Sequence, residues 1–239
     1  SNKVLAEITS LQAEESSLAV NSETALLKRL IPVGKEQLTR KAERTNSNRT
    51  CKVSFGIDAV HYFLNISKKE LEQVLNSTAD RLGPHLLESW VVTNESQTGL
   101  SLNCDQITRH DVTVGDIIGL LTEETGKQEQ QGTIAIVRWI RNDKDNHINI
   151  GIEFISGNLL PAMCRLIDGP NTNNTFAAIF ISSMALHDMP ATLITPKKVY
   201  QRGRIMEVTI GDQPLRIKAG YLRDDTFAFD RFDFTSLNT

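Results

Sequence analysis

Short apolar runs, many of them rich in β-branched and aromatic residues, recur over much of this chain, which is typical of β-strands. These runs are separated by short polar turns. Strands at this spacing predict an antiparallel barrel or sandwich rather than a βαβ sheet. The strands predicted in the first two thirds of the chain are 51–64, 86–92, 100–102, 117–121, 133–140 and 148–155.

Four segments show helical signals instead. Val4–Leu18 has apolar residues at i, i+3 and i+4, and a second helix is predicted to begin near Ser22 and to end before Pro32. Ser67 and Glu70 form a capping-box pattern that predicts a helix continuing to Leu75. The apolar run Leu159–Ile167 predicts a further short helix.

A second β pattern follows residues 168–174, whose sequence DGPNTNN makes them the best linker candidate. Its predicted strands are 176–182, 191–194, 205–210, 215–222 and 227–234. Gly211-Asp212 predicts a tight hairpin between two of them. The fold class is therefore mainly β (α+β). The predicted domains are a helical segment (1–38), a β-barrel (39–168) and a small β module (175–239).

Composition limits the kinds of partner. The net charge of −3 over 239 residues argues against a general nucleic-acid binder, although a local basic pocket is compatible with it. No apolar run approaches the roughly 20 residues of a transmembrane helix, and no secretory signal opens the chain. We therefore expect a cytoplasmic protein without membrane insertion. The three cysteines are expected to be buried free thiols. Ser1-Asn2 resembles the remnant of a removed tag, so we expect a longer natural N-terminus.

Enzyme signatures are missing from the sequence. The five histidines are scattered, and none pairs with another ligand type at metal spacing. There is no Gly-x-Ser-x-Gly motif and no phosphate-binding loop ending in Gly-Lys-Ser/Thr. We nominate no catalytic residue, no metal site and no cofactor.

Two polar features remain as candidates for ligand binding. The stretch Asn94-Glu95-Ser96-Gln97-Thr98-Gly99 carries an amide, a hydroxyl and a glycine between two apolar runs. By itself it is more often a β-turn without a ligand. A basic arm, residues 35–49, precedes the first strand and carries Arg40, Arg44 and Arg49. Arginine binds phosphate through a planar, charged fork and stacks on purine faces, so the two features could together hold a small nucleotide.

This combination resembles the PilZ family, the bacterial cyclic di-GMP receptor domain. The family pairs Arg-x-x-x-Arg on an N-terminal arm with Asp/Asn-x-Ser-x-x-Gly on a six-stranded antiparallel barrel. Here Arg40 and Arg44 match the first motif, and Asn94, Ser96 and Gly99 match the second. The similarity covers about residues 39–168, including later strand patterns. These are Val114–Asp116, Ala135–Trp139 and Ile150–Phe154, with Leu159–Ile167 in place of the usual helix.

The resemblance implies a role for each matched residue. Arg40 and Arg44 would hold phosphates and stack on guanines, Asn94 and Ser96 would hydrogen-bond a guanine edge or the ribose-phosphate, and Gly99 would keep the turn tight. The gap between Arg44 and Asn94 is long for the family, because the helix that starts at Ser67 is inserted there. The functional pair could instead be Arg44 and Arg49.

Two functions stay open at this point. One is a cyclic di-GMP-binding regulator in bacterial signal transduction, whose arm and domains rearrange on binding and which acts on another protein. The alternative is a degenerate PilZ-like domain that has lost nucleotide binding and serves as a protein-interaction scaffold.

Overall fold

The computed structural model describes residues 45–75, 80–104, 108, 110–122, 133–143, 147–167, 174–183 and 190–237. The two predicted N-terminal helices lie outside these residues, and so do Arg40 and Arg44. Residues 44–239 form one compact unit. None of the helices in the described part has the length and apolar character needed to cross a membrane.

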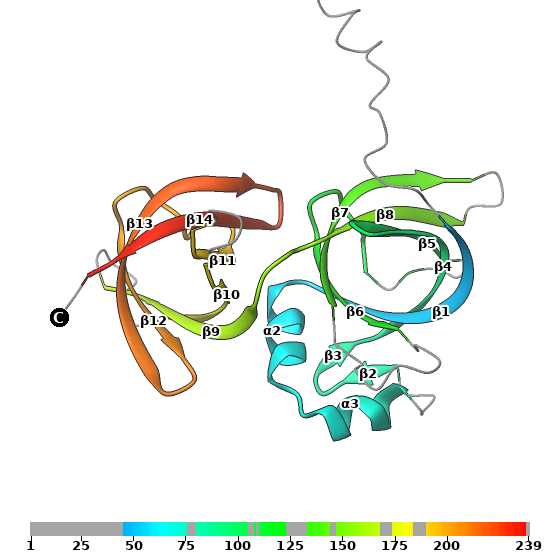
Figure 1. The fold of residues 1–239 in the computed structure, drawn as a ribbon, viewed down its shortest axis with the longest axis horizontal. Coiled ribbons are helices and arrows are strands. Elements are labelled where there is room, and N and C mark those ends of the chain that lie inside the picture. Colours follow the sequence, from blue (N-terminus) through cyan, green and yellow to red (C-terminus); the bar gives the residue numbers. More distant parts are fainter. Residues whose placement is uncertain are drawn as a thin grey trace, which may run out of the picture. The chain divides into compact units, whose positions relative to one another are not determined.

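The first β structure is a closed barrel of six antiparallel strands (Figure 1). In spatial order its strands are β1 (Thr45–Phe55), β4 (Glu88–Ser96), β5 (Gly99–Cys104), β8 (Ile148–Phe154), β7 (Thr133–Asn142) and β6 (Ile117–Thr122). Closure removes the exposed sheet edges that would otherwise pair with other chains. The predicted six-stranded antiparallel barrel is confirmed.

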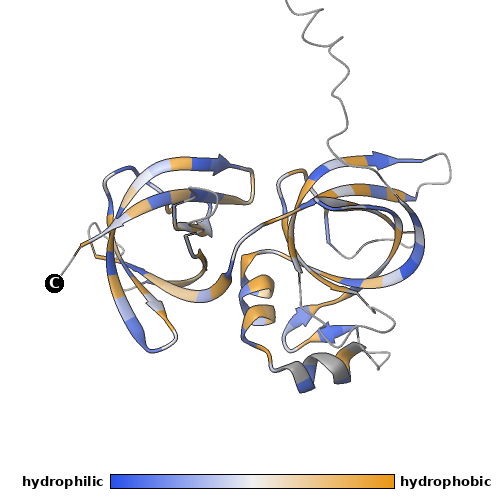
Figure 2. Ribbon diagram, viewed as in Figure 1, coloured by the Kyte–Doolittle hydropathy of each residue, from blue (hydrophilic) through white to orange (hydrophobic). Residues whose placement is uncertain are grey.

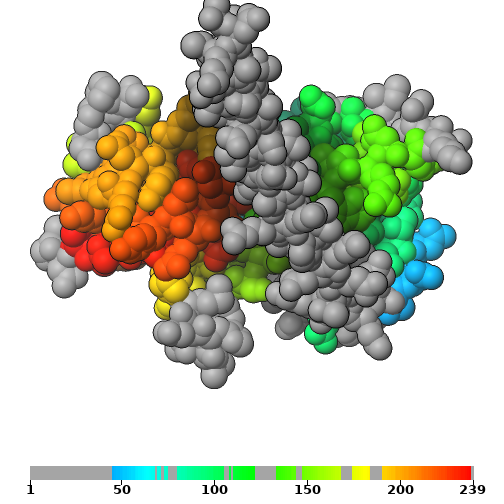
Figure 3. Space-filling model, turned by 90° about the horizontal axis from the view of Figure 1, so that it is seen from above, coloured from blue at the N-terminus to red at the C-terminus, as the bar shows by residue number. Residues whose placement is uncertain are grey.

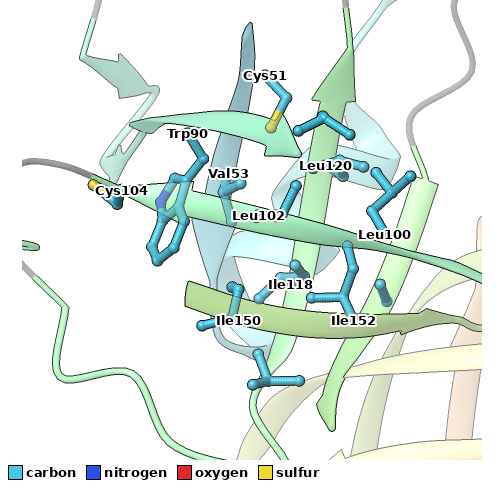
Figure 4. Packing of buried hydrophobic residues seen from close by; sticks show 13 residues of the cluster. Cys51, Val53, Trp90, Leu100, Leu102, Cys104, Ile118, Leu120, Ile150 and Ile152 are labelled. Carbon is cyan, nitrogen blue, oxygen red and sulfur yellow. The ribbon is translucent and has the colours of Figure 1, made fainter. Parts of the chain in front are cut away.

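Alternate side chains of these strands fill the barrel interior. Orange and blue residues alternate along the strands in Figure 2, as the period of two requires. Figure 4 shows side chains of this inner cluster, among them Trp90, which is 1% exposed. Cys51 and Cys104 belong to this core, and burial raises the pKa of the Cys51 thiol to about 12. Cys164 is also buried and free, so the expectation for all three thiols is confirmed.

The segment predicted as one strand, 51–64, is half helix. β1 ends at Phe55, Gly56 turns the chain with a φ of 93°, and α2 (Ile57–Asn65) follows. Its buried residues Ile57, Val60 and Phe63 recur every third position, which places them on one helical face. The prediction of a strand beyond Phe55 was therefore wrong, since β-branched and aromatic residues also suit a buried helix.

The helix predicted after Ser67 is present as α3 (Lys68–Leu75). The Glu70 backbone N–H donates to Ser67 Oγ at 3.3 Å, and the Ser67 backbone N–H donates to Glu70 Oε2 at 3.2 Å. This reciprocal pair is the predicted capping box. A small hairpin, β2 (Arg81–Leu82) and β3 (His85–Leu86), then leads into β4.

The second β module is also a closed six-stranded barrel. In spatial order its strands are β10 (Thr175–Ile181), β11 (Thr192–Pro196), β14 (Phe229–Ser236), β13 (Gln213–Asp225), β12 (Ile205–Ile210) and β9 (Leu159–Leu166). In the view of Figure 3 the orange and red atoms are the outer surface of β12 to β14. The hairpin predicted at Gly211-Asp212 is confirmed, because Ile210 pairs with Gln213 and Gly211 has a φ of 57°.

The helix predicted over Leu159–Ile167 was wrong. That segment is β9, which pairs with β10 on one side and β12 on the other. Ala162 and Cys164 are buried while Met163 and Arg165 are exposed, so the segment alternates with the period of a strand. The predicted range 39–168 therefore includes a strand of the second barrel. The predicted linker, 168–174, joins the paired strands β9 and β10, and most of it lies outside the described residues.

One apolar cluster contains residues of both barrels and of α2. Strands β6 and β7 contribute Ile117, Ile134 and Ile136, and the second barrel contributes residues that include Ile179 and Phe229. Each of these five side chains is at most 2% exposed. Burial of this kind contributes roughly 1.5–3 kcal/mol for a large apolar side chain, so the two barrels stabilise each other.

Candidate functional site

The predicted polar loop is a hairpin with a two-residue turn. Asn94 and Ser96 lie in β4, Gln97 and Thr98 make the turn, and Gly99 begins β5. Ser96 pairs with Gly99, and its Oγ donates a hydrogen bond to the Gly99 carbonyl oxygen at 3.0 Å. The motif is therefore built into two strands of the barrel wall.

A β-bulge turns Asn94 and Ser96 to the outside of the barrel. Val92 points into the core, and Thr93 is the extra residue where the β4–β5 register shifts. Asn94 then lies opposite Ser101, whose neighbours Leu100 and Leu102 face inward. Directly opposed residues share a face of a sheet, so Asn94 and, two positions later, Ser96 face outward.

The outer face next to this hairpin is hollowed. The cavity has a volume of about 220 Å³, and we call it the outer-face hollow. It is lined by Ser96, Thr98, Gly99 and Leu100 of the hairpin, Arg138 and Trp139 of β7, and Gly151, Ile152 and Glu153 of β8. A Cβ atom on Gly99 would lie 1.9 Å from the Ile152 carbonyl oxygen, so only glycine allows β5 and β8 to approach this closely here.

A second bulge places two consecutive β7 residues on the outside. Val137 pairs with Ile152 and Trp139 pairs with Gly151, which leaves Arg138 as the extra residue. Trp139 is 37% exposed. A Cβ atom on Gly151 would lie 1.8 Å from the indole Nε1, so the indole occupies the space that a side chain at position 151 would fill. The bulge and this glycine together make one wall of the hollow.

The charged groups on this wall pair across the strands. Arg138 Nε donates to Glu153 Oε2 at 2.6 Å, and their side chains are 42% and 52% exposed. The Arg141 guanidinium lies 6.0 Å from the Trp139 ring centroid, at the limit of a cation–π contact. The hollow therefore offers an aromatic surface, a hydroxyl, a guanidinium and a carboxylate.

Arg49 lies on a different face from Asn94 and Ser96. In β1 it pairs with Val92, whose side chain points into the core, so Arg49 lies on the inward-facing side of its strand. Its Nη2 lies 2.9 Å from Glu95 Oε1, and its buried Nε has no hydrogen-bond partner among the described residues. The ion pair ties the beginning of β1 to β4. Arg40 and Arg44, the other predicted phosphate ligands, lie outside the described residues.

Arg138, Trp139 and Glu153 line the hollow but were not among the site residues predicted from the sequence. Their signal was local: Arg138-Trp139 breaks the strict alternation of β7, and Gly151 lacks a side chain opposite the indole. Within the described part of the chain, His, Cys, Asp and Glu do not gather in groups of three that could hold a metal ion. The residues lining the hollow include neither histidine nor cysteine. This set suits noncovalent recognition of an aromatic, hydrogen-bonding ligand.

Comparison with known families identifies the first barrel. The family described as "Cyclic-di-GMP receptor FimW, middle PilZ domain" matches residues 84–161, which include the motif hairpin and all residues lining the hollow. The chain contains a PilZ domain. The resemblance drawn from Asn94, Ser96 and Gly99 is thereby confirmed.

The second barrel has a counterpart in the same kind of protein. Residues 162–237 match the family described as "FimW C-terminal beta-barrel domain", so the PilZ domain is followed by a recognised β-barrel module. The chain is also 25% identical over 146 residues to the "Cyclic-di-GMP receptor FimW" of Pseudomonas aeruginosa. That alignment covers 61% of this chain but only 23% of the relative.

Proposed function

We propose that this protein binds cyclic di-GMP in the outer-face hollow and acts as a regulatory effector rather than an enzyme. One observation carries the proposal: the motif residues Ser96 and Gly99 line a hollow whose opposite wall presents an exposed indole and a guanidinium. The matched family, which is described as a cyclic di-GMP receptor, supports the choice of ligand.

The motif residues and the indole of the hollow each have a defined task in this proposal. Asn94 and Ser96 hydrogen-bond a guanine edge or the ribose-phosphate, and Gly99 lets the ligand approach the backbone. Trp139 supplies a flat apolar surface for a purine, and stacking of a base on an aromatic side chain is worth about 1–3 kcal/mol. No group undergoes covalent chemistry, which fits a receptor.

The phosphates require cations from the arm. We assign them to Arg40 and Arg44, which have the spacing that the PilZ resemblance implies. Arg49 is held by its ion pair with Glu95, which supports a role in anchoring the arm to β4. An ionised guanidinium and a phosphate form strong, bidentate hydrogen bonds, and two of them would neutralise the two charges of the ligand.

The response to the ligand is a rearrangement of the arm and of the domains, which a protein partner in the cytoplasm then recognises. Strand β7 supports this part of the proposal. Its residues Arg138 and Trp139 line the hollow, while Ile134 and Ile136 on the same strand belong to the cluster that also contains residues of the second barrel. A ligand that moves one end of β7 therefore acts on packing at the other end.

Calorimetric titration with cyclic di-GMP tests the proposal. Ser96→Ala removes a hydroxyl from the hollow and should weaken binding about tenfold. Ser89→Ala is the matched control, because Ser89 is an exposed serine on the same strand. Absence of binding at about tens of micromolar ligand, or equal affinities of the two variants, would contradict the proposal.

A second candidate is an interaction scaffold without nucleotide binding. It is favoured by two large aromatic side chains exposed on the second barrel, Phe227 at 81% and Tyr221 at 59%. A partner protein that is captured equally by the wild type and by a variant carrying Ser96→Ala and Arg44→Ala would support this candidate. Capture that requires cyclic di-GMP would exclude it.

A further inference from the structure

The ion pair on the wall of the hollow has hydrogen-bonding groups left over. Arg138 uses its Nε to reach Glu153 Oε2 at 2.6 Å. Within the described residues, the two Nη groups of Arg138 and the second carboxylate oxygen of Glu153 have no partner, and both side chains line the hollow. The wall therefore presents a charged donor directly beside a charged acceptor.

This arrangement matches one purine and opposes the other. The Watson–Crick edge of guanine carries the O6 acceptor beside the N1–H donor, and adenine carries the N6 donor beside the N1 acceptor. We propose that the Arg138–Glu153 pair reads guanine, with an Nη group donating to O6 and the second Glu153 oxygen accepting from N1–H. This inference rests on the proposed function and names the groups that determine its specificity.

The surroundings of the pair place a base within its reach. The bulge that turns Arg138 outward also turns Trp139 outward, so the aromatic surface and the pair are adjacent. Gly151, which lies opposite Trp139, gives the indole its place against the barrel wall. A purine in the hollow therefore lies between Ser96 on β4 and the pair on β7 and β8, with the indole beside it.

Stability does not account for the pair, since exposed ion pairs typically contribute only about 0–1 kcal/mol. The ion pair can, however, help to bind a ligand. Each partner holds the other in place before the ligand arrives, which lowers the entropy cost of ordering two long side chains on binding. An adenine in the same place would set its N6 donor against the guanidinium, and the resulting unpaired groups would reject it.

The second barrel supplies a matched control pair. Arg165 of β9 and Glu207 of β12 form a similar cross-strand ion pair at 2.8 Å, with side chains 46% and 29% exposed. They do not line the hollow. Glu153→Gln and Glu207→Gln therefore make the same chemical change in two similar pairs, only one of which adjoins the hollow.

The test is calorimetric titration of each variant with cyclic di-GMP and with cyclic di-AMP. Glu153→Gln should weaken cyclic di-GMP binding about tenfold and reduce the preference over cyclic di-AMP by at least about the same factor. The reason is that a glutamine amide can also donate to adenine N1. Glu207→Gln should change neither value. A Glu153→Gln variant that keeps the wild-type ratio of the two affinities overturns the inference.

A second variant keeps the ion pair and reverses its order. Combining Arg138→Glu with Glu153→Arg preserves the charges on the wall, so folding should survive, but the donor and acceptor exchange places. We expect loss of the guanine preference, and an unchanged preference would overturn the inference. Wild-type protein that binds no cyclic di-GMP would reject the proposed function itself. Binding that is sensitive to Ser96→Ala but indifferent to both pair variants would reject the guanine reader alone.

Discussion

The two barrels share an architecture but use their outer-face glycines differently. In the PilZ barrel, Gly151 gives the Trp139 indole its place against the wall, and a hollow lies beside it. In the second barrel, a Cβ atom on Gly220 would lie 2.1 Å from Asp233 Oδ1. That carboxylate fills the space and accepts a hydrogen bond from the Tyr221 backbone N–H at 2.6 Å.

The difference lies in the side chain that takes the glycine's space. Trp139 is brought there by a bulge that also exposes Arg138, so the glycine becomes part of the wall of the hollow. Asp233 of β14 instead accepts a hydrogen bond from the backbone of the neighbouring strand β13 and pairs with Arg223, which satisfies its charge within the barrel. A six-stranded barrel with a surface glycine is therefore not by itself a binding site, since the site is made by the side chains placed on the fold.

The largest effect is expected from truncating a core side chain in either barrel, which also tests whether the two barrels unfold together. Trp90→Ala in the first core and Phe232→Ala in the second should each lower the free energy of unfolding by about 3–5 kcal/mol, because both side chains are at most 1% exposed. The cluster that includes Ile134 and Phe229 spans both barrels, so each variant should still unfold in one transition. Scanning calorimetry measures this. Two well-separated transitions would show that the barrels are independent.

The second largest effect is expected from substitutions of the two outer-face glycines. Gly151→Ala and Gly220→Ala should each destabilise the protein by about 1–3 kcal/mol, because a neighbouring side chain must move. Only Gly151→Ala should also weaken cyclic di-GMP binding, by about tenfold, since it displaces Trp139 from the wall of the hollow. Denaturant unfolding and calorimetric titration measure the two effects. Equal loss of affinity in both variants would remove the functional contrast between the barrels.

The barrels should also differ in their response to pH. In the PilZ barrel, the hydrogen bond with Asp116 raises the pKa of His110 above its ordinary 6.5, against the opposing effect of burial. Burial raises the pKa of Asp116, but hydrogen bonds from His110 and Thr113 outweigh burial and hold it below the ordinary 3.8. The stability from His110 is complete below pH 6.5 and is lost as pH rises through its raised pKa. The stability contributed by the Asp116 carboxylate is complete above pH 3.8 and is lost as the pH falls through its lowered pKa.

We therefore expect the melting temperature to fall as the pH rises from about 5.5 to about 8. The fall should not exceed about 2–4 °C, because the His110 side chain is 40% exposed and solvent screens the pair. In the second barrel, hydrogen bonds to Asp225 and Asp230 raise the pKa of Lys197 above 10.5, so its contribution is constant over this range. His110→Asn should abolish this fall and leave the opposite contribution of His61, whose pKa is lowered by burial. A fall of the same size in the variant would assign it to other groups.

The smallest effect is expected from the control ion pair. Arg165→Ala should change the free energy of unfolding by no more than about 1 kcal/mol, since the pair with Glu207 is exposed. Arg138→Ala should have an equally small effect on stability for the same reason, but it should weaken cyclic di-GMP binding. Chemical denaturation of both variants checks this. A much larger loss in Arg138→Ala would mean that its pair is part of the framework of the barrel.

Local signals in the sequence were sufficient for several features. Ser67 and Glu70 specified a capping box, and Gly211-Asp212 specified a hairpin turn, because both depend on residues a few positions apart. The motif Asn94–Gly99 correctly indicated a PilZ domain. What it could not show was the length of the turn, since Asn94 and Ser96 are held in β4 by pairing with distant strands.

Where the sequence pattern fitted both a helix and a strand, tertiary contacts decided the secondary structure. Residues 57–65 and 159–166 are short apolar runs, and such runs fit a buried helix or a buried strand equally well. The first became helix because Gly56 ends β1 and its apolar face packs against both barrels. The second became a strand because β10 and β12 offered hydrogen bonds on both sides.

The sequence by itself determined that the chain is mainly β, that a PilZ motif lies at Asn94–Gly99 and that a second β module follows. Only the tertiary structure decided which side chains share the site. It turned Arg138 and Trp139 outward through a bulge and placed Glu153 beside them, while it gave Arg49 the inward register with Glu95. The physical reason is that the facing of a strand residue depends on cross-strand register, and register is fixed by partners far away in the sequence.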